Sequence, residues 1–155
     1  KRDHEEAIAA AKQAITLNPS SADAYLGLGS ALYFSNKPKE ALDYLNKAIR
    51  LNPMPPSDYY LFLGHCYQSL ERFAEALEAY KKAAEIAPGN LYAHLGLAVT
   101  YINMGREHEA REAALIVLSI DPDFSTNADR EASPNKNRNA VKRFYEAARK
   151  AGLPE

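Results

Sequence analysis

The apolar residues of this chain recur at helical spacing, in pairs of short stripes separated by polar turns. In the stretch 21–54 the first stripe follows the i, i+3, i+4, i+7 pattern of one helix face, and it consists of Tyr25, Leu28, Gly29 and Leu32. The second stripe follows Pro38, which suits the first turn of a helix, and it consists of Ala41, Leu45 and Ala48. Pro53 cannot continue a helix and restricts the residue before it. The pattern predicts two helices followed by a forced turn.

This pair of stripes returns with a regular period. The prolines that end the second helix are separated by 34, 35 and 34 residues, and they are Pro19, Pro53, Pro88 and Pro122. The small residue early in that helix shows the same steps, at Ala7, Ala41, Ala76 and Ala110. Since two independent markers keep one register, the chain is predicted to be an array of structural repeats, in which each unit covers the apolar face of its neighbour.

The unit resembles the tetratricopeptide repeat (TPR), whose signature is W-x2-L-G-x2-Y, then A-x3-F, then P. The stretch 55–89 matches it from Tyr60 and Ala76, whereas 90–122 departs from it where Ala114 replaces the bulky residue of the second helix. The resemblance implies an all-α, right-handed helical solenoid of helix-turn-helix units with a capping helix at its C-terminal end. The TPR array at 1–122 is divided into a half repeat at 1–20 and full repeats at 21–54, 55–89 and 90–122.

The sequence after Pro122 changes character. Residues 123–138 are polar, with recurring Asn and Pro, and they predict a linker. Residues 139–152 restore a helical stripe, which consists of Val141, Phe144, Tyr145 and Ala148. Two interpretations of this helix stay open: it either caps the last repeat, as a solenoid requires, or it folds back into the groove of the array as an internal ligand.

A narrower resemblance concerns a few short strings. "RLNPMPPSDYYLFLGHCY", "IDPDFS" and the terminal "ARKAGLPE" are similar to the C-terminal TPR region of certain bacterial class III nucleotide cyclases and related regulators. In such proteins a catalytic or DNA-binding domain lies N-terminal to the repeats, which would explain a chain that begins in the middle of a repeat. The alternative function implied is a regulatory or oligomerisation module of a larger bacterial signalling protein.

Composition and charge exclude several classes of partner. The formal net charge is −1, so no global field attracts nucleic acid or an acidic membrane surface, and no apolar run approaches the roughly 20 residues that span a bilayer. The single cysteine, Cys66, suits a reducing, cytoplasmic location. The four histidines lack metal-ligand spacing, and no phosphate-binding glycine loop or nucleophile elbow is present. We therefore expect no enzymatic activity, metal or cofactor, and no nucleic-acid or membrane partner.

The resemblance also assigns candidate binding residues, because the first helix of each TPR unit lines a concave groove. From 21–54 these residues are Asp23, Leu26, Ser30, Tyr33 and Phe34. From 55–89 they are Asp58, Leu61, His65, Gln68 and Ser69, and from 90–122 they are Tyr92, Leu95, Val99, Ile102 and Asn103. The lining is mostly apolar, which favours a partner, with Tyr33, Phe34 and Tyr92 as candidate anchors. The alternative is that tight curvature buries some of these residues against neighbouring repeats.

These observations predict a non-enzymatic protein–protein interaction scaffold that binds a peptide or helical segment in a mostly apolar groove. Chaperone-binding members of the family clamp a terminal carboxylate with Lys, Arg and Asn. In this chain the corresponding positions carry Leu26, Ser30, Phe62, Tyr92 and Gly96. Recognition of a chaperone tail is therefore not expected. A rival prediction is self-association, in which chains stack or the exposed half repeat pairs with another copy.

Overall fold

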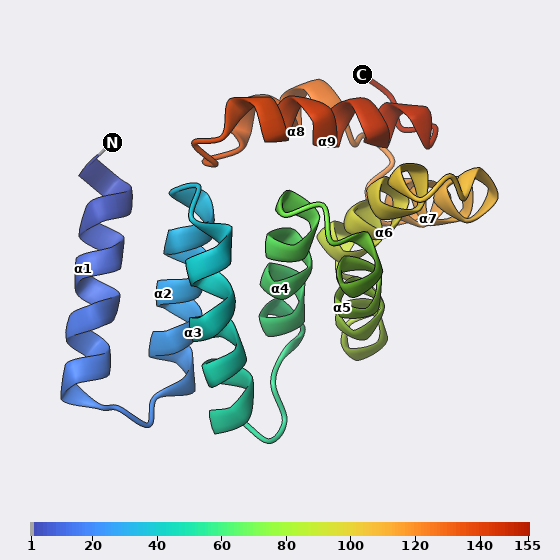
Figure 1. Cartoon of the computed structure of the whole chain (residues 1–155). Helices are drawn as coiled ribbons and strands as arrows, with labels where there is room; N and C mark the ends of the chain where they lie inside the picture. Colours follow the sequence, from blue (N-terminus) through green and yellow to red (C-terminus); the bar gives the residue numbers. More distant parts are fainter. Residues whose placement is uncertain (1) are drawn as a thin grey trace.

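The computed structural model describes residues 2–155, which form nine α-helices and no strand. The helices are α1 (Arg2–Leu17), α2 (Ala22–Phe34), α3 (Pro38–Leu51), α4 (Ser57–Ser69), α5 (Phe73–Ile86), α6 (Leu91–Asn103), α7 (Glu107–Ile120), α8 (Thr126–Ala132) and α9 (Arg138–Lys150). Helices α1 to α5 stand side by side, and α9 lies crosswise at one end of the array, where it packs against α6 (Figure 1). The prediction of an all-α helical repeat fold is confirmed.

The same turn joins the two helices of each full repeat. In each of these three turns one residue has a positive φ angle, and these residues are Asn36 (63°), Glu71 (58°) and Gly105 (73°). In the first of these turns, the backbone N–H of Lys37 donates to the carbonyl oxygen of Leu32 at 2.9 Å. Equivalent bonds close the turns after α4 and α6. This arrangement satisfies a free carbonyl at the helix end and sets the second helix antiparallel to the first.

Glycines let the helices of the array approach closely. A Cβ atom added to Gly29 would lie 2.6 Å from a side-chain carbon of Leu45, and one added to Gly64 would lie 2.6 Å from the ring of Tyr80. Gly96 lies against the same tyrosine ring. Tyr80 of α5 therefore packs between α4 of its own repeat and α6 of the next, which joins the two repeats.

The buried residues form two clusters. One consists of residues from α2 to α5, with side chains of α1 packed against it. The other extends from α4 to the end of the chain, and its C-terminal members are Phe124, Val141, Tyr145, Ala147, Ala148, Ala151 and Leu153. The C-terminal segment, which we define as residues 123–155, thus shares one core with the last repeats.

The prediction of a polar linker at 123–138 is wrong in part, because α8 lies within it. The Ser125 hydroxyl oxygen accepts a hydrogen bond from the backbone N–H of Ala128 and caps this helix. The backbone N–H and the hydroxyl of Thr126 both donate to the carbonyl oxygen of Pro154, at 2.9 and 2.8 Å. Helix α8 has seven residues, of which only Thr126 is buried. It is therefore stabilised by its cap and its tertiary hydrogen bonds, and not by burial of an apolar stripe.

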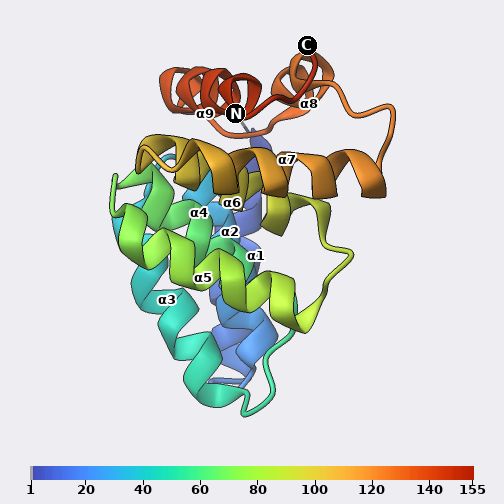
Figure 2. The ribbon, with the colours of Figure 1, turned by 90° about the vertical axis from the view of Figure 1, so that its right-hand side faces the viewer.

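Helix α9 combines features of a cap on the last repeat with features of an internal ligand of the groove. Its predicted stripe is buried at Val141, Tyr145 and Ala148, and the helix packs against α6 of the last repeat. With α8 it forms a layer over the repeat helices (Figure 2). The contact is with the first helix of the repeat, however, which is the helix expected to line the groove. Every helix within residues 2–155 is too short or too polar to cross a bilayer.

Candidate functional site

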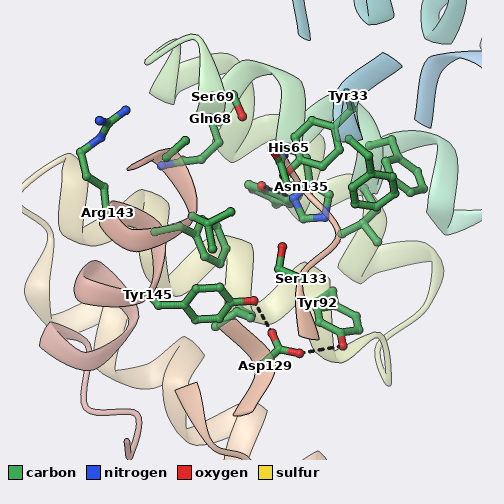
Figure 3. Close-up of a pocket in the computed structure, with 18 of the residues that line it drawn as sticks. Tyr33, His65, Gln68, Ser69, Tyr92, Asp129, Ser133, Asn135, Arg143 and Tyr145 are labelled. Atoms are coloured by element: carbon green, nitrogen blue, oxygen red, sulfur yellow. Dashed lines mark hydrogen bonds between the residues drawn. The ribbon is translucent and has the colours of Figure 1, made fainter. Parts of the chain in front are cut away.

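A cavity of about 420 Å³ lies between the repeat helices and the C-terminal segment. Residues of α2, α4 and α6 line one side, whereas α8, α9 and their connection line the other (Figure 3). The volume lies within the range of known ligand pockets, about 300 to 1,000 Å³. This cavity is the candidate functional site.

The structure brings together more than half of the groove residues predicted from the sequence. Those that line the cavity are Tyr33, Phe34, Leu61, His65, Gln68, Ser69, Tyr92, Leu95 and Asn103. The groove residues that lie elsewhere are Asp23, Leu26, Ser30, Asp58, Val99 and Ile102. The cavity therefore occupies only part of the predicted groove.

The predicted residues outside the cavity have structural surroundings. The Asp23 carboxylate accepts a hydrogen bond of 2.6 Å from the Tyr59 hydroxyl in the next repeat. Leu26 and Ile102 are partly buried against the two cores, and the Ser30 hydroxyl donates to the carbonyl oxygen of Gly27 within its own helix. Asp58 is exposed at the start of α4.

Part of the predicted groove lining is buried around α6, which is the alternative interpretation of these residues. Leu95 and Val99 are 1% and 0% exposed, and they belong to one core cluster with Val141 and Tyr145 of α9. Leu61 of α4 is 7% exposed. The physical reason is that α9 packs against α6 and removes from water the side chains that a free concave face would present.

An aromatic cluster forms the wall of the cavity nearest the N-terminal repeats. The rings of Tyr33 and His65 are stacked, with centroids 5.3 Å apart, and Phe62 meets the edge of His65 at 5.9 Å. Phe34 packs edge-on against Phe62 at 5.8 Å. Because rings in stacked and edge-on arrangements attract one another, this packing stabilises the wall, which presents apolar surface.

Burial keeps the titratable groups of this wall uncharged at neutral pH. It lowers the pKa of His65 to about 4 and raises the pKa of Tyr33 to about 12. It also raises the pKa of Tyr80, whose hydroxyl lies 2.8 Å from Nδ1 of His65, well above the ordinary value. The wall therefore favours an uncharged, apolar or aromatic group.

One carboxylate ties the C-terminal segment together beside the cavity. Asp129 of α8 accepts hydrogen bonds from the hydroxyls of Tyr145 in α9 and, at 3.0 Å, of Tyr92 in α6 (Figure 3). Burial, with Asp129 as the next cause, raises the pKa of both tyrosines. Asp129 thus accepts bonds from two neutral tyrosines and links α8, α9 and the last repeat.

The connection between α8 and α9 crosses to the first repeats. The backbone N–H of Lys136 donates to the carbonyl oxygen of Phe34 at 2.9 Å. The Asn137 amide donates to the side-chain oxygen of Asn36, also at 2.9 Å, and Nε2 of His4 lies 3.0 Å from the carbonyl oxygen of Pro134. The C-terminal segment therefore spans the array from α6 to α1.

The residues of the C-terminal segment that line the cavity were not among the predicted site residues. They include Asp129, Ser133, Asn135, Arg143, Phe144 and Tyr145. The signal that pointed to them was the apolar stripe at Val141, Phe144 and Tyr145, together with the interpretation of this helix as an internal ligand. Nothing in the spacing of residues 125–137 indicated contact with α2.

The arrangement is suited to binding. Within residues 2–155, His, Cys, Asp and Glu side chains nowhere form a group of three that could hold a metal ion. Cys66 is buried, and burial raises the pKa of its thiol to about 12, so the nucleophilic thiolate does not form at neutral pH. The lining can enclose one or two bulky apolar side chains beside hydrogen-bonding groups such as Gln68 and Asn135.

Family models match most of the chain. Two models described as tetratricopeptide repeat match residues 1–54 and 68–129. A third, described as regulator of microtubule dynamics protein 1-3, matches residues 30–88.

Relatives and solved structures agree with these models. The peroxisomal targeting signal receptor of Kluyveromyces lactis is 32% identical over 97 residues, covering 61% of this chain and 17% of the receptor. The crystal structure of YrrB, "a TPR protein with an unusual peptide-binding site", matches with a TM-score of 0.68 at 27% identity, over 97% of this chain and 77% of that chain. The crystal structure of MamA matches with a TM-score of 0.73 at 24% identity, over 97% and 88%, and this likeness concerns the fold alone.

The chain spans a small part of its curated relatives. It covers 17% of the length of the receptor and 10% of sperm-associated antigen 1 of Mus musculus, to which it is 32% identical over 97 residues.

Proposed function

We propose that this chain, which belongs to the tetratricopeptide repeat family, binds a peptide or helical segment of another protein at the cavity in its concave groove. As a member of this family, it is a protein–protein interaction scaffold and not an enzyme.

One observation carries this proposal: most of the predicted groove residues surround a cavity of about 420 Å³. The lining is apolar and aromatic on the side of Phe34, Phe62 and Tyr92, which is the composition of interface hot spots. YrrB is described as a TPR protein with a peptide-binding site, and the name of the K. lactis receptor refers to a targeting signal. Both descriptions are consistent with segment recognition on this fold.

Truncation of the aromatic wall is expected to weaken binding about tenfold or more, because buried aromatic anchors dominate interface energies. Peptides would first be selected from a display library on the immobilised chain, and their affinity would then be measured by fluorescence anisotropy. The variant is Phe34→Ala with Phe62→Ala, two residues of this wall, and circular dichroism would confirm its fold.

The matched control is Leu115→Ala, which truncates an exposed apolar side chain on α7, remote from the cavity. Its affinity for the selected peptides is expected to equal that of the unaltered chain. Equal affinities for the cavity variant and the control would reject the groove as the binding site.

A second candidate function, self-association, is favoured by exposed apolar side chains on α7. Leu115 and Ile116 of this helix are 66% and 40% exposed. Pairing of two copies through this face would cover both side chains.

Under this second proposal, the molar mass measured by light scattering rises with concentration, and Ile116→Lys returns it to that of the monomer, because a lysine ammonium on the face disfavours its burial. Met54→Lys, in an exposed turn, is the control that leaves association intact. A monomer mass at all concentrations would exclude this function.

A further inference from the structure

We propose that the groove beneath α9 is a docking site for an amphipathic helix of a partner protein, and that α9 is its resident, displaceable occupant. The inference rests on the proposed function and names the class of segment that this site takes. It also gives the C-terminal segment a role, since the partner binds by displacing α9.

The chemistry of the partner can be read from the way α9 itself is bound. Its face toward the array presents Val141, Tyr145 and Ala148, which are 6%, 7% and 0% exposed. Its opposite face presents Lys142 and Glu146 to solvent. A short amphipathic helix whose residues at i, i+4 and i+7 contact a groove is the usual form of helix recognition, so α9 shows which kind of segment this surface accepts.

The fit of α9 to the groove is incomplete. Protein interiors are close-packed, yet a cavity of about 420 Å³ remains between α9 and the aromatic wall. Ala140 at the start of α9 lines the same cavity as Phe34 and Phe62, and its side chain is small. A helix with a bulky apolar residue at the position of Ala140 would fill this space and bind more tightly.

Few polar contacts hold the start of α9 on the array. The Asn137 amide donates to Asn36, and the backbone N–H of Lys136 donates to Phe34. The Asn137–Asn36 contact is exposed, where hydrogen bonds compete with water. Covalent connection nevertheless gives α9 a high effective concentration at the groove, of millimolar order for a short linker, so it blocks weaker ligands until a better-fitting helix is present.

The experiment uses the full chain and two labelled synthetic peptides, which carry residues 137–153 either unaltered or with Ala140→Leu. In the released variant, Asn137→Ala with Tyr145→Phe, α9 loses its hydrogen bonds to Asn36 and Asp129 and the N-cap bond from Ala140 to Asn137, while its apolar stripe is kept. In the closed variant, Asn36→Cys with Asn137→Cys, a short bismaleimide joins the two sites. The buried Cys66 thiol, with its pKa raised to about 12, does not react.

The released variant is expected to bind both peptides about tenfold more tightly than the unaltered chain, since the hydrogen bonds to Asn36 and Asp129 and the N-cap no longer hold the internal helix. The Ala140→Leu peptide is expected to bind more tightly than the unaltered peptide, and cross-linking of the closed variant is expected to abolish binding. Circular dichroism shows that each variant is folded, and the uncross-linked closed variant is its own control.

The proposal is overturned if the cross-linked and uncross-linked forms bind the peptides equally, or if release has no effect. It is also overturned if light scattering shows dimers that exchange α9, since the occupant would then be a second copy. If library-selected peptides bind every form equally, this inference fails while the proposed function stands. If no peptide of either kind binds even the released variant, both fail.

Discussion

Replacement of Tyr80 by alanine is expected to lower the free energy of unfolding by about 3 to 5 kcal/mol, the range for truncation of large buried aromatic side chains. Tyr80 is 0% exposed, and its ring lies against Gly64 of α4 and Gly96 of α6. Because these helices belong to successive repeats, the void would open at the interface that joins them. The substitution also leaves Nδ1 of His65 without its hydroxyl partner. Urea denaturation followed by circular dichroism measures the loss.

The matched control for this variant is Tyr44→Ala in α3. Tyr44 is only partly buried, and its ring is 6.4 Å from that of Tyr25. Its truncation is expected to lower the free energy of unfolding by less than half as much, because less surface returns to water. Equal losses for the two variants would contradict the assignment of Tyr80 as the residue that joins two repeats.

A double-mutant cycle tests the contact itself. On the unaltered chain, Gly96→Val forces a side chain into the space of the Tyr80 ring, and such overpacking destabilises by about 1 to 3 kcal/mol. With Tyr80→Ala the same valine has room. The loss of unfolding free energy in the double variant is therefore expected to be smaller than the sum of the losses in the two single variants. Strict additivity would show that the ring and the glycine do not share this space.

The features that the sequence made predictable are those that the repeat enforces locally. Spacing of apolar residues predicts the helices of each unit, and Pro38 lies in the first turn of α3 as expected. The small size of Gly29 indicates a site of close helix contact, and Leu45 indeed packs against it. Ser21 precedes α2, where serine is a preferred N-cap, and it accepts a hydrogen bond from the backbone N–H of Ala24.

The features that could not be predicted depend on contacts between distant parts of the chain. An apolar residue such as Val99 has the same spacing whether its face is open or covered, so the pattern cannot reveal that α9 lies over α6. Helix α8 is too short to show a stripe, and its bonds to Pro154 join residues 28 positions apart. The hydrogen bond between Asn137 and Asn36 spans 101 positions. Only the folded chain brings these groups together.

Acid is expected to destabilise the protein through His65. Burial lowers the folded-state pKa of this ring to about 4, whereas an unfolded chain has a histidine pKa of about 6.5. Between these two values the unfolded state binds more protons than the folded state, so the free energy of unfolding falls as the pH falls. With about 1.4 kcal/mol for each pH unit, the loss from this residue approaches 3 kcal/mol by about pH 4.

The variant that isolates this contribution is His65→Gln, since glutamine does not titrate and its side-chain oxygen can accept a hydrogen bond from the Tyr80 hydroxyl. Carboxylates also contribute in this range, because salt bridges from Arg72 and Arg106 lower the pKa of Glu75 and Glu109. The unaltered chain and the His65→Gln variant both retain these salt bridges. The difference between their unfolding free energies at each pH, measured by urea denaturation, therefore reports on His65 alone. The difference is expected to grow from about pH 6.5 to about pH 4 and then to level off. Curves that stay parallel would mean that the ring is hydrated when the protein is folded, and that the aromatic wall of the cavity is open to water.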